Sequence, residues 1–161
     1  MKTTTLNTKV NDFLGQKRIA VVGVSRNKSR HPTGSMIYRR LRTAGHEVFP
    51  VNPHLQTFEG DRCYPDLQSI PGGVDGAVIV TRPEVTEQIV HDCSDAGVRR
   101  VWMHQSMGKK GSSVSAKAVE YCREHNIGVI AGACPMMFGP GADLGHTCMR
   151  WMLRLTGGLP T

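Results

Sequence analysis

Short apolar runs alternate with amphipathic stretches along most of this chain, and this alternation constrains its fold more than any other feature. The runs are rich in Val and Ile, as strands are, and apolar residues at helical spacing follow most of them. Strands that alternate with helices build a parallel sheet covered by helices. We expect strands at 18–22, 46–51, 62–64, 76–80, 100–103 and 127–130, and helices at 32–44, 83–96, 113–125 and 144–156.

The pattern predicts one α/β domain over residues 1–161, with a mostly parallel sheet and helices on both faces. At 161 residues the chain can bury a single core and needs no second domain. The run at 76–80 is apolar throughout, which is typical of a central strand. Residues 1–16 are expected to form an N-terminal extension with a short helix, packed on the outside through Val10, Phe13 and Leu14.

Charge and cysteine content narrow the class of function. A net charge of +7 favours an anionic ligand, but the basic residues do not form the arm, recognition helix or aromatic ladder of a nucleic-acid module. The sequence has no apolar run long enough for a membrane span and no secretory signal. Five widely spaced cysteines do not suit a disulfide framework. We therefore expect a cytoplasmic protein with a small-molecule partner, and no binding to nucleic acid or membrane.

The loop after the first strand departs from the dinucleotide-binding fingerprint. A Rossmann fold normally carries G-x-G-x-x-G at this point, with an acidic residue about 20 positions later. Here Gly23 stands at one glycine position and Ser25 at the next. The second strand ends in Val51-Asn52-Pro53, without a carboxylate for the ribose. The fold is thus predicted to be Rossmann-like, with a ligand other than plain NAD.

The same loop is rich in groups that bind phosphate. It provides backbone N–H groups at a helix start, together with the hydroxyls of Ser25, Ser29 and Thr33. Its three cations are Arg26, Lys28 and Arg30. Ligands of an open α/β sheet bind outside the carboxyl ends of the strands. That rule groups the loops 23–33, 51–53, 81–83, 104–108 and 132–135 at one edge.

Several short segments, taken in order, carry a resemblance to a known family. They are Val21–Asn27 before a helix, Val51-Asn52-Pro53, Tyr64-Pro65-Asp66-Leu67, Thr81-Arg82-Pro83-Glu84 and Ala133-Cys134-Pro135. In these segments the chain resembles the small bacterial CoA-binding proteins, which are related to the nucleotide-binding domain of the succinyl-CoA synthetase alpha subunit. The resemblance covers most of residues 12–155.

The resemblance implies coenzyme A or an acyl-CoA as the ligand. The pyrophosphate would be wrapped by Gly23, Val24, Ser25 and Arg26. The ribose 3′-phosphate would meet Lys28 or Arg30. The adenine would be flanked by Val51, Asn52 and Pro53. The pantetheine arm would run along Thr81, Arg82 and Pro83, with Gln105 and Cys134 toward the thiol end.

The family's synthetases also need a phosphorylated histidine from a second domain and a partner subunit, for which this chain has no room. We therefore expect CoA binding without independent synthetase activity and without a catalytic residue. No metal is expected, since Cys122-x-x-His125 and His146-x-Cys148 lack the second half of a zinc motif. Two alternatives stay open. One is an NAD(P)-binding oxidoreductase or redox sensor with Arg26 at a 2′-phosphate, and the other is an interaction module with a vestigial pocket.

The sequence allows two interpretations of Cys134 and two of the last helix. Cys134 is either an inert buried thiol or, at a strand end that faces helix amides, a thiol of lowered pKa able to form a mixed disulfide with CoA. The last helix is apolar enough either for a homodimer contact or for capping the domain's own core. Its apolar residues are Trp151, Met152, Leu153 and Leu155.

Overall fold

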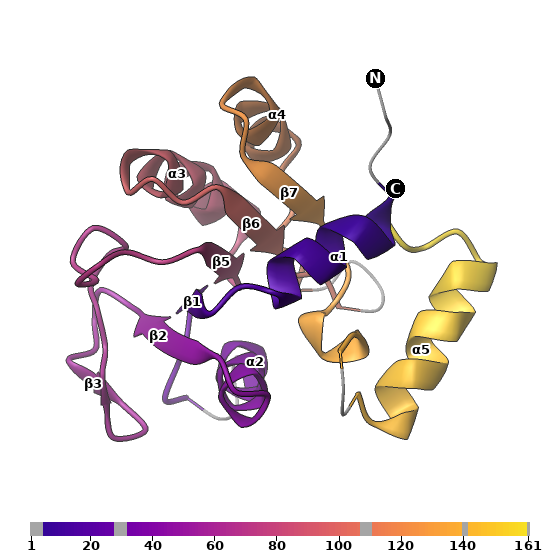
Figure 1. The fold of residues 1–161 in the computed structure, drawn as a ribbon, viewed down its shortest axis with the longest axis horizontal. Helices are drawn as coiled ribbons and strands as arrows, with labels where there is room; N and C mark the ends of the chain where they lie inside the picture. Colours follow the sequence, from indigo (N-terminus) through magenta and orange to yellow (C-terminus); the bar gives the residue numbers. More distant parts are fainter. Residues whose placement is uncertain (1–4, 28–31, 107–110, 140–141, 161) are drawn as a thin grey trace.

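A single parallel sheet organises the protein. In the computed structural model, which describes residues 5–27, 32–106, 111–139 and 142–160, the sheet has the strand order β2-β1-β5-β6-β7 (Figure 1). Its strands are β1 (Arg18–Val22), β2 (Glu47–Val51), β5 (Gly76–Ile79), β6 (Arg100–Met103) and β7 (Gly128–Ala131). All four pairings are parallel, and β5 is the central strand. The predicted Rossmann-like α/β fold is confirmed.

The strand order reverses direction between β1 and β5. From β1 the chain steps outward to β2, and then it returns to the other side of β1 and continues through β5, β6 and β7. At such a reversal, the loops that leave the two neighbouring strands diverge to opposite faces and open a crevice at the carboxyl edge. The loops that follow β1 and β5 therefore flank the place where this fold type holds its ligand.

Alternate strand residues serve two separate cores, because successive side chains point to opposite faces of a sheet. One face carries Ile19, Val21, Val78, Trp102 and Ile130, and the other carries Ala20, Val22, Ala77, Ile79, Val101 and Met103. Burial on both faces explains why the strands read as continuous apolar runs.

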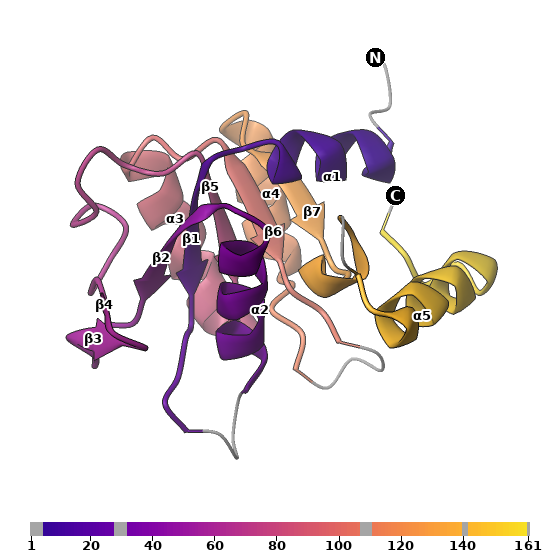
Figure 2. The same ribbon diagram turned by 60° about the horizontal axis from the view of Figure 1, so that its bottom comes forward.

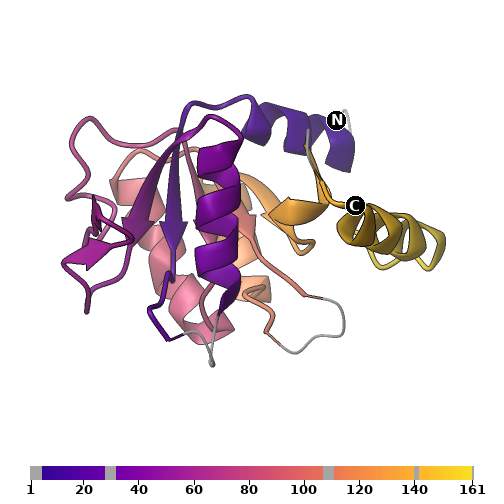
Figure 3. The same ribbon diagram turned by 90° about the horizontal axis from the view of Figure 1, so that it is seen from below.

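The helices divide between these two faces, as Figures 1 and 2 show. The first face is covered by α1 (Leu6–Leu14), α2 (Pro32–Thr43) and the 3-10 turn η1 (Pro135–Met137). The second is covered by α3 (Pro83–Asp95) and α4 (Ala116–Glu124). Helix α5 (Leu144–Leu155) lies beside η1, at the outer edge of the molecule (Figure 3). None of the helices in the described ranges is long and apolar enough to cross a membrane.

The N-terminal helix packs as expected. Val10 and Phe13 of α1 are buried, and the Phe13 ring meets the Trp102 ring edge-on with centroids 5.4 Å apart. Leu14 is half-buried against the same core. The side chain of Thr5 caps the helix by accepting a hydrogen bond from the backbone N–H of Thr8.

The prediction of a strand at 62–64 is wrong. Its place is taken by a small antiparallel hairpin of β3 (Thr57–Phe58) and β4 (Asp61–Arg62), which stands apart from the main sheet. Glu59 and Gly60 form its turn with positive φ values of 49° and 87°, the conformation of a tight two-residue hairpin. Tyr64 makes only an isolated parallel bridge to Val51.

Candidate functional site

Two glycines bring the end of β1 and the start of α2 into direct contact. Gly23 has a φ of 102°, and a Cβ there would lie 2.3 Å from the carbonyl oxygen of Val80. A Cβ on Gly34 would lie 2.6 Å from the carbonyl oxygen of Gly23. This close approach of helix and strand is the role of the third glycine in the dinucleotide fingerprint. Sequence reasoning named Gly23 but missed Gly34, because the intervening loop is longer than the fingerprint allows.

The loop between these glycines is braced through its carbonyl groups. The side-chain amide of Asn52 donates to the carbonyl of Val24 at 2.7 Å, and the Ser35 hydroxyl donates to the carbonyl of Ser25 at 2.9 Å. Among the described residues, the backbone N–H groups of Ser25 and Arg26 have no acceptor. The loop thus presents unpaired donors, as an anion-binding loop does.

Arg26 connects this loop to the hairpin. Its Nη2 donates to the carbonyl oxygen of Thr57 at 2.7 Å and to the Thr57 hydroxyl at 2.9 Å. A guanidinium has five N–H donors, so these two bonds leave other donors for a ligand. Arg26 is exposed at the surface of the loop.

The hairpin is itself fastened to α2. Arg39 donates from Nε to Glu59 at 2.7 Å, and Arg42 pairs with Asp61 at 2.8 Å. The Tyr38 hydroxyl donates to the same Asp61 carboxylate, and burial of Tyr38 together with this bond raises its pKa above the usual value. The hairpin therefore forms a fixed wall opposite the first loop.

A cavity of 470 Å³ lies between the loop, α2 and the hairpin. It is lined by Ser25, Arg26, Ser35, Met36, Arg39, Phe58 and Glu59. Its volume falls in the range of about 300–1,000 Å³ that is typical of small-molecule sites. Arg26 and the Ser25 hydroxyl give it anion-binding character, Arg39 is paired with the Glu59 carboxylate that also lines it, and Met36 and Phe58 give it apolar surface. Of the lining residues, sequence reasoning had named only Ser25 and Arg26.

The segment after β5 lies next to the first loop, at the sheet edge where both were predicted. The Thr81 methyl would lie 3.3 Å from a Cβ on Gly23. The Thr81 hydroxyl is 3.0 Å from that of the buried Thr86, which in turn donates to the carbonyl of Arg82 at 3.2 Å. Arg82 is the N-cap of α3 without a side-chain cap bond, and Pro83 follows at the first turn. The two loops that flank the reversal of strand order are thus adjacent.

The predicted thiol-end residues form a second group at the ends of β6 and β7. The backbone N–H of Gln105 donates to the carbonyl of Ala133 at 3.3 Å, and the same carbonyl accepts from the Trp102 indole at 3.2 Å. Burial raises the pKa of Cys134 to about 11, which is opposite to the lowered value considered from the sequence. Neither Gln105 nor Cys134 lines the cavity beside Arg26.

The remaining predicted residues have different surroundings. Val51 is buried in the core, Asn52 is half-buried and Pro53 is exposed. Thr33 is half-buried in the first turn of α2. Lys28, Ser29 and Arg30 lie outside the described residues, so their predicted role stays a prediction. Within the described part of the chain, no three His, Cys, Asp or Glu side chains come together as metal ligands would.

His104 is a buried polar residue at the carboxyl end of β6. It is 1% exposed, and its Nδ1 has no hydrogen-bond partner among the residues that the structure describes. Burial lowers its pKa, so the ring is neutral at pH 7. The residue lies on the ligand edge of the sheet, one position before Gln105.

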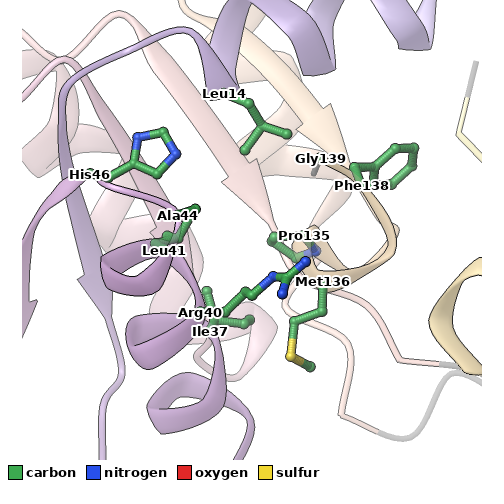
Figure 4. A pocket seen from close by; sticks show the side chains of 10 residues that line it. All are labelled: Leu14, Ile37, Arg40, Leu41, Ala44, His46, Pro135, Met136, Phe138 and Gly139. Carbon is green, nitrogen blue, oxygen red and sulfur yellow. The ribbon is translucent and has the colours of Figure 1, made fainter. Parts of the chain in front are cut away.

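A second, apolar cavity of 130 Å³ lies between α1, α2 and η1 (Figure 4). It is lined by Leu14, Ile37, Arg40, Leu41, Ala44, His46, Pro135, Met136, Phe138 and Gly139. Leu14 and His46 precede β1 and β2, so this cavity lies toward the amino ends of those strands. It shares no lining residue with the cavity beside Arg26, and the loops predicted to bind phosphate do not line it.

Comparison with known proteins shows the family to which this chain belongs. The model of the CoA binding domain matches residues 17–140, which include all five strands of the sheet and the loops described above. The chain belongs to this family of CoA-binding domains.

Individual relatives of this CoA-binding domain include ligases. The alpha subunit of acetate–CoA ligase [ADP-forming] II from Pyrococcus furiosus is 26% identical over 140 residues, which are 84% of this chain and 30% of that protein. The apo structure of the dinucleotide-forming acetyl-coenzyme A synthetase 1 from Ca. Korarchaeum cryptofilum is 29% identical, with a TM-score of 0.63, over 75% of this chain and 27% of that one. The CoA-binding domain thus spans less than a third of either ligase.

A relative of similar extent is also found. The uncharacterized protein YneT of Bacillus subtilis is 28% identical over 118 residues, which are 73% of this chain and 82% of that protein.

Proposed function

We propose that this chain binds coenzyme A or an acyl-CoA at the carboxyl edge of its sheet, in the cavity beside Gly23 and Arg26. The observation that carries the proposal is the 470 Å³ cavity between the first loop and the hairpin of a CoA-binding domain. It combines the remaining donors of the Arg26 guanidinium with unpaired backbone donors, which suits the phosphates of such a ligand.

The charged part of the ligand has identifiable partners. The amides of Ser25 and Arg26 and the remaining donors of the Arg26 guanidinium would hold the pyrophosphate. Lys28 and Arg30, in the same loop, would meet the 3′-phosphate. Asn52 holds the 51–53 segment against Val24, which supports a place for the adenine beside that segment and the apolar side chain of Met36.

The pantetheine arm would follow the crevice between β1 and β5. Thr81, Arg82 and Pro83 border the crevice next to Gly23, and Gln105 and Cys134 stand further along the same edge. The raised pKa of Cys134 supports the role of an inert wall residue there, since the thiol is protonated at neutral pH.

The proposal is binding without acyl-CoA synthesis by this chain alone. The ligase subunit that it resembles is longer, and the chain spans 30% of it. The matched residues do not include the remaining part of that subunit, so the proposal assigns them the binding of CoA alone. Cytoplasmic location is part of the same proposal.

Thermal unfolding with CoA, 3′-dephospho-CoA, NADP and NAD at equal concentrations tests this function. A ligand that binds the native state raises its stability by about 2.7 kcal/mol at 100 times its Kd. We expect the largest rise in Tm with CoA and a smaller one with 3′-dephospho-CoA. Arg26→Ala should reduce the rise with CoA, whereas Arg123→Ala, on the exposed face of α4, should not. A response to NADP alone would support the oxidoreductase alternative, and no response to any of the four would support the vestigial pocket.

A further inference from the structure

Helix α5 has two apolar faces, and the fold uses only one of them. Met149 and Leu153 are half-buried against the main core, and the Arg150 guanidinium stacks 5.5 Å from the Phe138 ring centroid. The opposite face is exposed, with Leu144 at 81%, Trp151 at 67% and Leu155 at 69%. A contiguous exposed apolar patch on a protein is typical of a surface that binds a partner.

Four exposed residues of α5 form a stripe whose spacing is the same from either end of the helix, and the exposed Met152 lies beside it. Leu144, Cys148, Trp151 and Leu155 follow one another in steps of four, three and four residues. At about 100° per residue they fall within an arc of about 60°. Because the spacing is symmetric, an antiparallel copy of α5 presents the same stripe in the same register. Leu144 then faces the partner's Leu155, and Cys148 faces the partner's Trp151.

The charges beside the stripe fit the same arrangement. Asp143 and Arg154 lie on the same flank of the stripe, at opposite ends of the helix. A two-fold axis that crosses an antiparallel helix pair places this flank of both helices on the same side of the contact, and it reverses the direction of the second helix. Asp143 of one copy therefore lies near the partner's Arg154, and the symmetry repeats this pair once more. The backbone N–H of His146 donates to Asp143 at 2.8 Å and holds its pKa below the usual range, so its carboxylate is charged at neutral pH. The same carboxylate lies 2.6 Å from His146 Nδ1, and its side chain is still 66% exposed, which leaves it open to the partner's Arg154. Arg154 has no ion-pair partner among the described residues.

The position of α5 leaves room for a second copy. The helix contacts the rest of the domain through η1 and stands at one end of the long axis, while β3, next to the proposed CoA site, stands at the other (Figure 1). We propose that α5 packs antiparallel against α5 of a second copy of this chain, about a two-fold axis, with the stripe Leu144, Cys148, Trp151 and Leu155 at the centre. The contact is small, so the dimer dissociates on dilution.

Molar mass by light scattering or sedimentation, over a hundredfold range of protein concentration, tests the contact. We expect the wild type to pass from monomer to dimer as concentration rises. Trp151→Glu should stay monomeric with unchanged helix content by circular dichroism, and Arg123→Glu, on α4, should dimerise like the wild type. A wild type that is monomeric throughout, or a Trp151→Glu variant that still dimerises, would overturn the proposal.

Oxidative cross-linking tests the antiparallel register. In a Cys148→Ser background, the variant Leu144→Cys/Leu155→Cys should give a disulfide-linked dimer on a non-reducing gel. Within one helix these positions are about 16 Å apart, so the bond cannot form inside one copy. Each single cysteine variant should cross-link far less. If a single variant cross-links as efficiently as the double one, the helices do not pair antiparallel in this register. CoA binding of Trp151→Glu should equal that of the wild type, which separates this proposal from the proposed function.

Discussion

Arg26 and Thr57 are 31 residues apart in sequence, yet one guanidinium nitrogen of Arg26 donates to both the carbonyl and the hydroxyl of Thr57. This pair fixes the orientation of a cation proposed to meet phosphate. Binding geometry in the first loop therefore depends on a distant two-stranded hairpin.

Replacement of Thr57 by Val removes the hydroxyl acceptor while it keeps size and β-propensity. We expect the Kd for CoA to rise about threefold to tenfold, in line with a net hydrogen bond of about 0.5–1.5 kcal/mol. Titration calorimetry measures the effect. Thr43→Val, on the exposed end of α2, is the matched control, and equal affinities for both variants would show that Thr57 does not orient Arg26.

Gly34→Ala should destabilise the protein, although the same change usually stabilises a helix by about 1 kcal/mol. The new Cβ would lie 2.6 Å from the backbone carbonyl of Gly23, which cannot move without shifting β1. We expect a loss of about 1–3 kcal/mol in the free energy of unfolding, measured with urea. Gly128→Ala is the control, because its Cβ would meet only the Arg99 carbonyl at 3.5 Å. Equal midpoints for the two variants would contradict this account.

His104 should make stability depend on pH. Burial lowers its pKa in the folded state, so below about pH 6.5 the unfolded chain binds a proton that the folded chain does not. Its contribution to stability is therefore complete above that pH and is lost as pH falls. Urea midpoints of the wild type should drop between about pH 7 and pH 5, and His104→Gln should flatten the slope. His125→Gln, an exposed control, should keep the wild-type slope; a His104→Gln slope like that of the wild type would refute the role of His104.

Cys134 should resist alkylation. The residue is 5% exposed and burial raises the pKa of its thiol to about 11, whereas Cys148 is exposed on α5. Brief iodoacetamide treatment at pH 7.5, followed by mass spectrometry, should modify Cys148 well before Cys134. Cys148→Ser should remove the early modification. A CoA adduct on Cys134 in the folded protein would instead revive the reactive thiol considered from the sequence.

The strands of the sheet could be predicted from sequence because each carries a short run rich in apolar residues, and the inner strands β1, β5 and β6 are buried on both faces. The same pattern groups the loops after the strands at one edge, but the strand order, which brings Thr81 next to Gly23, was not predicted. The hairpin could not be predicted in the same way, since β3 and β4 have two residues each and carry no periodicity. Phe58 and Glu59, which line the cavity, come from this hairpin and were missed for that reason.

Gly34 was missed for a different reason. Its role depends on the close approach of its backbone to Gly23, and ten residues separate the two glycines in sequence, where the fingerprint has far fewer. Val51 was predicted beside the ligand because its segment ends a strand at the correct edge. The side chain of Val51 is instead buried in the core, together with Tyr64, to which Val51 is bridged. Within this segment only Asn52 and Pro53 are open to solvent.

The hairpin wall is held to α2 by two arginine–carboxylate pairs that are partly open to solvent, Arg39 with Glu59 and Arg42 with Asp61. Added salt screens such pairs and also screens the attraction between Arg26 and a polyphosphate. A rise in ionic strength therefore has two effects on this protein: it weakens the attraction between Arg26 and the ligand, and it loosens the hairpin that forms one wall of the cavity.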